Sequence, residues 1–181
     1  MKELSLNILD VAKNSVTAGA DRIEISLVTD DNGMLTLIIK DDGCGMSEET
    51  VRNVTDPFYT TRTTRKVGLG LPLLKLAAEQ TGGSLTIRSS KDIADHGTIV
   101  TAVFDTNSID FTPVGDIVST ICTLIAGSPE IDFVFTDVSP MRRVELNTSD
   151  VRAALGDEIS IAEPEIQMWL GEYLKEQYEN Q

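Results

Sequence analysis

Apolar and polar residues follow two different periods in the first part of the chain. Leu4, Ile8, Val11 and Ala12 recur at the spacing of one helix face, which predicts a helix over residues 3–17. Strict alternation of apolar and polar residues instead predicts half-buried strands. Such alternation is found over residues 22–28, and further strands are predicted over 34–40, 84–89 and 98–104.

Turn and capping residues separate these elements. Residues 30–33 contain Asn-Gly and predict a tight hairpin turn. Ser47 is placed to cap a short helix, whereas residues 55–67 follow no regular pattern. Residues 68–80 begin glycine-rich and continue as a predicted helix, which the glycines at 82–83 end. The order of elements predicts an α+β fold, a two-layer sandwich in which helices cover one face of a mixed sheet.

The chain after Asp105 predicts a second, smaller region. Residues 105–113 form the predicted junction, so we expect one domain over 1–105 and a small acidic α+β extension over 106–181. Predicted helices in the extension cover 115–126, 149–155 and 164–178, and predicted strands cover 131–138 and 142–147.

One apolar stripe lies on the last predicted helix. It consists of Ile166, Trp169, Leu170, Tyr173 and Leu174. We expect an amphipathic helix that packs this stripe on a core, and docking of a partner protein is the alternative.

The net charge of -14 is unevenly distributed. Residues 1–105 hold 11 Lys/Arg and 15 Asp/Glu, which gives -4, and residues 106–181 hold 4 and 14, which gives -10. Nucleic acid is an unfavourable partner for such a surface, because neutralisation of phosphates by Lys and Arg dominates that affinity. The acidic extension is either a solvated face or a surface for a basic partner.

The cysteines and the N-terminus indicate a cytoplasmic protein. Cys44 and Cys122 are the only cysteines, which is too few for a disulfide framework or a zinc site. No apolar run approaches the ~20 residues that span a bilayer. Residues 1–3 do not begin a secretory signal. We therefore expect the reducing cytoplasm and no membrane contact.

A first candidate binding motif follows the second predicted strand. Asp41 is followed closely by Gly43, Gly45 and Met46. An ionised carboxylate only accepts hydrogen bonds, so Asp41 would select the exocyclic amine of adenine over the keto oxygen of guanine. Glycines without a Cβ atom would let the backbone approach a flat ring. An ordinary Asp-Gly turn is the alternative.

Polar residues share one face of the first predicted helix. Asp10 and Asn14 lie four residues apart, and Asn7 lies on the same face. The amide oxygen of Asn14 suits Mg²⁺, which binds few protein groups and would bridge to phosphates. Asp10 could orient or deprotonate a water as the catalytic residue. The alternative is a polar stripe exposed to solvent.

Small hydroxyls, cations and glycines occur together in the irregular segment and the helix start that follows it. This composition suits a phosphate cover, since backbone N–H groups at a helix start bind phosphate. The candidate contacts are Phe58, Thr60, Thr61, Arg62, Lys66, Gly68, Leu69, Gly70 and Leu71. A loop followed by an ordinary helix start is the alternative.

Gly97 and Thr98 begin the last strand of the first region. The hydroxyl of Thr98 could meet the adenine edge or its water. His96, the only histidine, adjoins them, and we interpret it as a surface turn residue and not as a phosphoacceptor.

The chain resembles the GHKL superfamily of gyrase, Hsp90, histidine kinase and MutL. Residues 9–15 with 18–20 resemble the N box, and 21–25 look most like its MutL branch. The G1 box is similar to residues 41–45. Residues 57–62 with 68–71 closely resemble the F and G2 boxes of histidine kinases, while Gly97 and Thr98 resemble the G3 position.

This resemblance covers about residues 3–105 and implies the Bergerat fold, with ATP and Mg²⁺ between the helices and a lid. The implied contacts are Asn14 with Mg²⁺, Asp41 with adenine, Gly68 and Gly70 with the phosphates, and Arg62 and Lys66 with the γ-phosphate.

Two departures from the superfamily pattern affect the expected function. Asp10 stands where many members have Glu, and its shorter side chain leaves hydrolysis in doubt. No helical hairpin with a phosphoacceptor histidine precedes the N box, so we expect a stand-alone module.

Three functions remain open at this point. The first is a kinase that transfers the γ-phosphoryl of MgATP to a His, Ser or Thr of another protein. The second is an ATP-gated switch that alters how residues 106–181 or a second copy of the chain docks. The third is a degenerate domain that binds no nucleotide.

Overall fold

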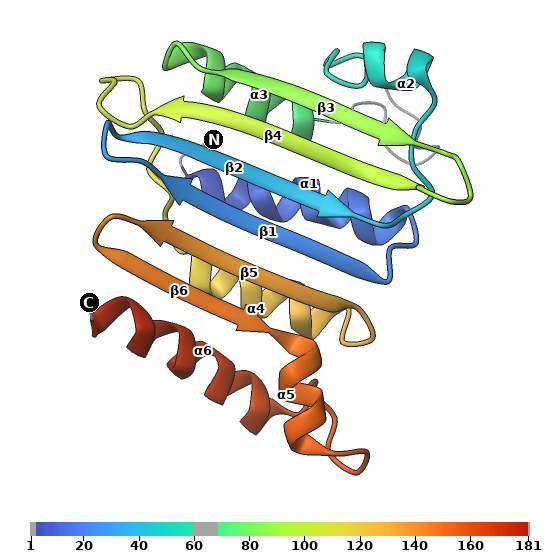
Figure 1. The fold of residues 1–181 in the computed structure, drawn as a ribbon, viewed down its shortest axis with the longest axis vertical. Helices are drawn as coiled ribbons and strands as arrows, with labels where there is room; N and C mark the ends of the chain where they lie inside the picture. Colours follow the sequence, from blue (N-terminus) through green and yellow to red (C-terminus); the bar gives the residue numbers. More distant parts are fainter. Residues whose placement is uncertain (1–2, 60–68, 181) are drawn as a thin grey trace.

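The structure, a computed structural model, describes residues 3–59 and 69–180. Its strands are β1 (Arg22–Thr29), β2 (Met34–Asp41), β3 (Ser84–Ser90), β4 (Gly97–Asp105), β5 (Asp132–Ser139) and β6 (Arg142–Asn147). Its helices are α1 (Leu4–Thr17), α2 (Glu48–Asn53), α3 (Gly70–Gln80), α4 (Ile117–Gly127), α5 (Thr148–Leu155) and α6 (Pro164–Glu179). The strands form one sheet in the order β3-β4-β2-β1-β5-β6 (Figure 1).

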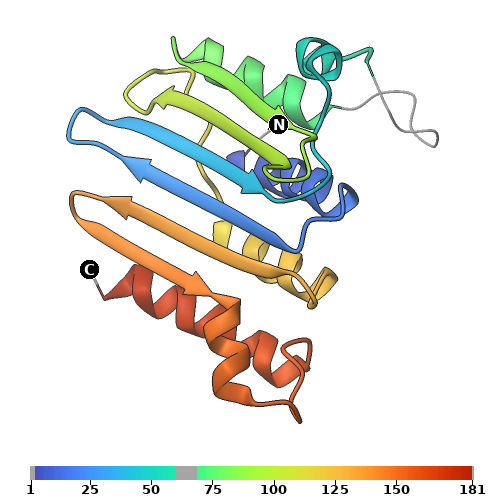
Figure 2. The same ribbon diagram turned by 45° about the vertical axis from the view of Figure 1, so that its right-hand side comes forward.

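The sheet is mixed, because β1 pairs with β5 in parallel and every other neighbouring pair is antiparallel. Helices α1, α3 and α4 lie against one face of the sheet, and α6 lies beside β6 at its edge (Figures 1 and 2). Within the described ranges, the opposite face carries no helix in either view. The predicted two-layer α+β sandwich is therefore confirmed.

Alternation along the strands separates the core from the open face. In β1, Ile23, Ile25 and Leu27 are buried, while the residues between them are less enclosed. Leu4 and Ile8 of α1 are fully buried on the same core. Burial of a Leu or Ile side chain contributes roughly 1.5–3 kcal/mol. The helix and strand patterns of the sequence therefore describe two sides of one hydrophobic core.

Residues 106–181 extend the same sheet. Phe133 and Phe135 of β5 are buried in the shared core, and α4 packs on α1. The linker also completes α1, since the N–H groups of Leu4 and Ser5 donate to backbone carbonyls at residues 113 and 114. The division of the chain at residue 105 stays a prediction, and the two parts contribute strands to one sheet and side chains to one core.

Two helices differ from the sequence pattern. Helix α4 begins at Ile117 and not at residue 115, because the Asp116 carboxylate accepts from Ser119 N at 2.9 Å and caps the first turn. On α6, Leu170 and Leu174 are fully buried, but Trp169 is 47% exposed. Among the described residues, no helix has the length and apolar character needed to cross a bilayer.

Candidate nucleotide-binding site

Asp41 lies at the end of β2, where three structural elements meet. It is a strand partner of Thr98 in β4 and of Ile23 in β1. Its carboxylate is 8% exposed and accepts from Ser15 Oγ of α1 at 2.5 Å and from Gly43 N at 3.0 Å. Each carboxylate oxygen has two lone pairs, so acceptor capacity remains for a ligand.

Ser15 was not among the residues selected from the sequence. It is 4% exposed and lies seven residues after Ile8, on the side of α1 that faces the sheet. A buried hydroxyl on an apolar helix face requires a hydrogen-bond partner. That requirement was the signal that could have identified Ser15, but it could not have named Asp41 as the partner.

The loop after Asp41 is attached to the end of the β3–β4 hairpin. Met46 N donates to Ser89 Oγ at 2.7 Å. The same hydroxyl lies 2.9 Å from the carbonyl oxygen of Gly97 and 2.8 Å from Thr98 Oγ1. Ser89 therefore links the loop to the start of β4. Strand alternation alone gave no signal for this role.

His96 also contacts this loop. Its Nδ1 lies 2.8 Å from the carbonyl oxygen of Gly43. Because a carbonyl only accepts, Nδ1 must carry the proton in this contact. Our interpretation of His96 as a turn residue omitted this contact, which joins residues 53 positions apart in the chain.

Backbone packing near Asp41 requires two of the glycines. Gly45 has φ +69, and a Cβ atom there would lie 1.8 Å from the carbonyl oxygen of Ser90. Gly97 has φ +135, and its Cβ would lie 2.1 Å from the carbonyl oxygen of Asp41. Close packing of backbone on backbone thus requires both glycines, whatever ligand approaches the loop.

The polar face of α1 lies next to the start of α3. Asp10 is exposed and Asn14 is half-buried. A Cβ atom built on Gly70 would lie 3.3 Å from Asp10 Cβ, so the first residue of α3 approaches α1 at that point. Leu69 is 47% exposed and Leu71 is buried. Helix α1 therefore connects the Asp41 loop, through Ser15, with the start of α3.

The structure thus brings Asp41, Gly43, Met46 and Thr98 together at one end of the sheet. Asp41, Gly43 and Met46 are joined to the β3–β4 hairpin by hydrogen bonds, and Thr98 faces Asp41 across the strands. Phe58 is 86% exposed, and its N–H donates to the Asp56 carboxylate. The remaining predicted contacts, Thr60, Thr61, Arg62, Lys66 and Gly68, lie outside the described residues.

The donor chemistry of this region fits an adenine nucleotide. Asp41 offers carboxylate lone pairs at an enclosed position, and the amide of Asn14 lies one residue from the Ser15 that holds this carboxylate. Within the described part of the chain, no group of three His, Cys, Asp or Glu residues forms a metal cluster. A single amide ligand is compatible with Mg²⁺, which keeps waters and binds phosphate oxygens.

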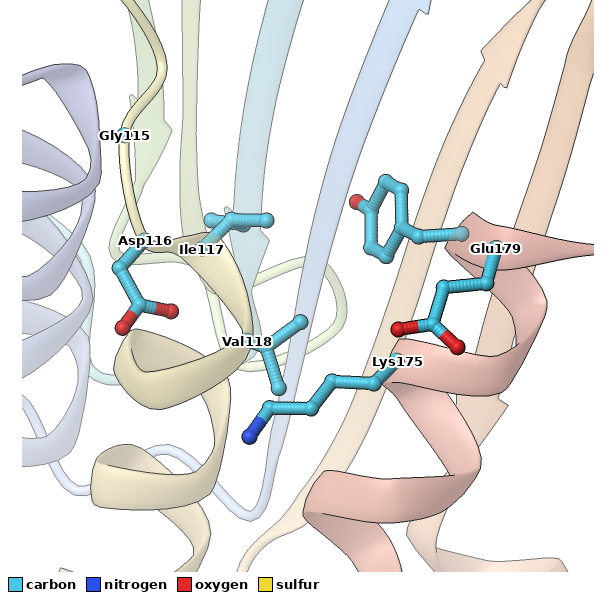
Figure 3. Close-up of a pocket in the computed structure, with 7 residues that line it drawn as sticks. Gly115, Asp116, Ile117, Val118, Lys175 and Glu179 are labelled. Atoms are coloured by element: carbon cyan, nitrogen blue, oxygen red, sulfur yellow. The ribbon is translucent and has the colours of Figure 1, made fainter.

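A separate hollow lies elsewhere on the molecule. It has a volume of about 240 Å³ and is lined by residues 115–118 at the start of α4 and by Lys175, Tyr178 and Glu179 of α6 (Figure 3). None of its lining residues belongs to the region around Asp41. The hollow is therefore not part of the candidate nucleotide site.

Comparison with known protein sequences identifies relatives of this chain. The family described as histidine kinase-, DNA gyrase B-, and HSP90-like ATPase matches residues 1–122. Sporulation kinase E of Bacillus subtilis is 30% identical over 93 residues, which cover 50% of this chain and 12% of that protein. Sensor protein SrrB of Staphylococcus aureus is 33% identical over 95 residues, covering 49% and 16%. The chain thus spans only a small part of these relatives' length.

Solved structures show the same fold. The ATPase domain of Aquifex aeolicus MutL, complexed with ADP, superposes with a TM-score of 0.51 at 17% identity and covers 81% of this chain and 63% of that chain. The N-terminal domain of a DNA repair protein gives a TM-score of 0.56 at 15% identity, covering 81% and 52%. The family match spans more than half of the chain, so the protein belongs to the histidine kinase-, DNA gyrase B- and HSP90-like ATPase family and contains its GHKL ATP-binding domain.

Proposed function

We propose that this protein binds MgATP at the end of β2 and transfers the γ-phosphoryl group to a partner protein in the cytoplasm. The observation that carries the proposal is the buried Asp41 carboxylate. It accepts hydrogen bonds from Ser15 Oγ and Gly43 N, and its oxygens keep further lone pairs that can accept from a ligand. An acceptor-only group in an enclosed position selects an amine, and adenine presents one.

The residues around Asp41 take supporting roles in this proposal. Thr98, opposite Asp41 in the sheet, presents its hydroxyl to the adenine edge or to a bridging water. Met46 and Gly43 shape the loop that packs beside the base. Asn14 would hold Mg²⁺, which supplies positive charge to the phosphates when bound. The protein's own task is to fix the orientation of the nucleotide, as is usual in phosphoryl transfer.

The start of α3 is suited to the phosphates. Leu69 occupies the N-cap position and provides no side-chain cap, so the first backbone N–H groups are not satisfied by that side chain. Uncapped N–H groups and the positive end of the helix dipole favour anions. Gly70 lies against α1 at Asp10, which supports one cleft for the phosphates between the two helices. Leu71 is buried and anchors this turn to the core.

In the proposed transfer, a nucleophile of the partner attacks the γ-phosphorus. The bond from the γ-phosphorus to the β–γ bridging oxygen breaks, and ADP leaves with that electron pair. Asp10, which is exposed on α1, accepts the proton of the attacking group or orients it. We also propose nucleotide contacts for Phe58, Thr60, Thr61, Arg62, Lys66 and Gly68, with Arg62 and Lys66 as the contacts of the γ-phosphate.

An ATP-gated interaction switch is the second candidate function. Helix α1, which contacts Asp41 through Ser15, packs on α4, and β1 pairs with β5. The Asp41 region is therefore in direct contact with elements of residues 106–181. Occupation of the site could therefore alter how the acidic extension, or a second copy of the chain, docks. The short side chain of Asp10 favours slow hydrolysis in this case.

Two measurements test the proposal and separate the candidates. Calorimetry with MgATP measures binding, with Asp41→Asn as the site variant and Asp31→Asn as a matched change in an exposed turn. Incubation with [γ-³²P]ATP, Mg²⁺ and a lysate of the source organism then measures transfer. Label on a partner protein supports the kinase. Binding without label, together with ATP-dependent protection from protease, supports the switch, and absence of binding heat contradicts both.

A further inference from the structure

Helix α6 is firmly attached to the sheet by its inner face. Leu170 and Leu174 are fully buried. The side-chain amide of Gln177 pairs with the backbone of Glu145 in β6, accepting from its N–H at 2.9 Å and donating to its carbonyl oxygen at 3.0 Å. This amide covers part of the open edge of the sheet, which would otherwise invite another strand. The outer face of α6 is therefore a fixed surface of the protein.

Large apolar side chains project from that outer face. Met168 is 67% exposed, Trp169 is 47% exposed and Tyr173 is 37% exposed. The rings of Trp169 and Tyr173 stack, with centroids 5.1 Å apart and an interplanar angle of 18°. Single exposed apolar residues are ordinary, but a preorganised aromatic pair beside a methionine has the composition of an interface centre.

Acidic residues surround these side chains. Glu165, Glu172 and Glu176 are exposed and recur at the spacing of one helix face. In the described part of the chain, none of the three forms an ion pair, whereas Arg142 and Arg152 pair with aspartates of β5. Lys175 is the cation on α6 itself, and its side chain lines the hollow that faces the start of α4 (Figure 3).

We propose that the outer face of α6, formed by Met168, Trp169, Tyr173, Glu165, Glu172 and Glu176, docks a basic segment of another protein. The apolar anchor of the segment would cover the aromatic pair, and its Lys or Arg side chains would meet the three glutamates. A cation above an exposed ring adds a favourable contact. A second copy of the chain presents the same acidic face, so like charges oppose that occupant.

This surface is separate from the nucleotide site. Helix α6 lies beyond β6 at one edge of the sheet, while β3, β4 and α3 lie at the other (Figures 1 and 2). Neither the glutamates nor the aromatic pair contributes to the contacts of Asp41. The docking test therefore needs no nucleotide, and its outcome is independent of the proposed phosphotransfer.

Trp169 is the only tryptophan of the chain and reports directly on this surface. The probe is a synthetic amphipathic peptide of about 16 residues, roughly four helical turns, built from Lys and Leu without aromatic residues. Its counterpart with Glu in place of every Lys is the control. At about 0.15 M salt, where exposed charges are screened beyond about 8 Å, we expect the basic peptide to change Trp169 emission saturably and the acidic peptide to leave it unchanged.

Variants separate local docking from attraction by overall charge. The double substitution Glu172→Lys with Glu176→Lys should weaken binding of the basic peptide by about tenfold or more, because it reverses charge beside the rings. Tyr173→Ala should also weaken it while keeping Trp169. The matched control is Asp31→Lys with Glu130→Lys, which changes net charge equally at exposed positions outside α6. This control should bind like the unmodified protein.

Each contrary result overturns the proposal. Absence of a saturable change up to millimolar peptide would show that the face does not dock a basic segment. If the Asp31→Lys, Glu130→Lys control lost as much affinity for the basic peptide as the α6 variant, binding would depend on net charge and not on the outer face of α6. Sedimentation of the free protein as a dimer that Tyr173→Ala dissociates would assign the face to a second copy. Circular dichroism and unfolding curves of every variant confirm that the comparison is made on folded protein.

Discussion

Ser15 Oγ lies 2.5 Å from Asp41 Oδ2, and through this contact helix α1 meets the end of strand β2. Both residues are nearly enclosed, with exposed fractions of 4% and 8%. Gly43 N holds the other carboxylate oxygen. The orientation of Asp41 is therefore set before any ligand binds. Preorganisation of this kind lowers the cost of binding, because fewer groups must be ordered on association.

Asp41→Asn should weaken MgATP binding by more than tenfold, about 1.4 kcal/mol or above. In one orientation of the new side-chain amide, its NH₂ group would face the amine of adenine, donor against donor. In either orientation, the negative charge of the carboxylate is absent. Titration calorimetry measures this difference. The same amide can donate to a keto oxygen, so the ratio of MgGTP to MgATP affinity should rise.

The Asp31→Asn variant provides the reference for this measurement, because residue 31 lies in the exposed β1–β2 turn. It should bind MgATP like the unmodified protein. Equal affinity of the Asp41 and Asp31 variants for MgATP would remove Asp41 from the adenine site.

Ser15→Ala should lower MgATP affinity by a smaller factor. It removes a hydrogen bond to a charged acceptor, which is worth roughly 1.5–3 kcal/mol, and part of that loss appears as reduced stability and not as weaker binding. The double variant with Asp41→Asn should bind no worse than Asp41→Asn alone, because Ser15 acts only through that carboxylate. Additive losses in calorimetry would instead indicate that Ser15 contacts the ligand itself.

The spacing of apolar residues was sufficient to predict the helices and strands, but not which strands pair with one another. Apolar spacing at Leu4 and Ile8 gave α1, and alternation gave β1 with its buried Ile23 and Ile25. The parallel pairing of β1 with β5 joins residues 110 positions apart, as in the bond between Ser26 and Thr136. Such pairings depend on chain topology. The alternation of side chains within one strand does not indicate which strand lies beside it.

The candidate site shows the same division. The residue types at Asp41 and Thr98 indicated their chemistry, and the sheet places them opposite each other. The supporting contacts of Ser15, Ser89 and His96 were missed, because each depends on a partner distant in sequence. Sequence patterns thus identified the residues proposed to contact the ligand, but not the residues that hold them in position.

Gly45→Ala should destabilise the protein strongly, while Gly127→Ala should not. A Cβ at residue 45 would overlap the carbonyl oxygen of Ser90 at 1.8 Å, and the positive φ adds strain. We expect a loss of at least about 2 kcal/mol in the free energy of unfolding. At Gly127, the last residue of α4, a Cβ meets nothing within 4 Å. Urea unfolding of both variants tests the contrast, and equal stabilities would contradict the backbone contact.

Tyr178→Phe should reduce stability at neutral pH, and the difference should narrow in alkali. Tyr178 Oη donates to Asp137 Oδ2 at 2.7 Å, and Arg142 donates to both oxygens of this buried carboxylate. Burial, followed by the charge of Asp137, raises the pKa of Tyr178 above its ordinary value. Because the pKa of Tyr178 is higher in the folded state than in the unfolded state, the neutral hydroxyl stabilises the folded protein. This contribution is complete below about pH 10, near the pKa of the unfolded state, and is lost as the pH rises beyond it.

The measurement is the free energy of unfolding in urea from pH 8 to pH 11. Below pH 10 the variant should be less stable by roughly 1.5–3 kcal/mol, the worth of a hydrogen bond to a charged acceptor. Above pH 10 the unmodified protein should lose up to about 1.4 kcal/mol per pH unit more than the variant. Parallel pH profiles for the two proteins would contradict the raised pKa of Tyr178.

Asn7→Leu should stabilise the protein. Asn7 lies on α1 one turn before Asp10, is 1% exposed, and neither atom of its amide has a hydrogen-bond partner among the described residues. An unsatisfied buried polar group costs about 1–3 kcal/mol, and leucine has the same number and branching of side-chain heavy atoms without that cost. The matched change Asn53→Leu removes an exposed amide that bonds Glu49 O and should bring no gain. A loss of stability on Asn7→Leu in urea unfolding would contradict the prediction, because it would mean that a buried water satisfies this amide or that leucine overpacks the site.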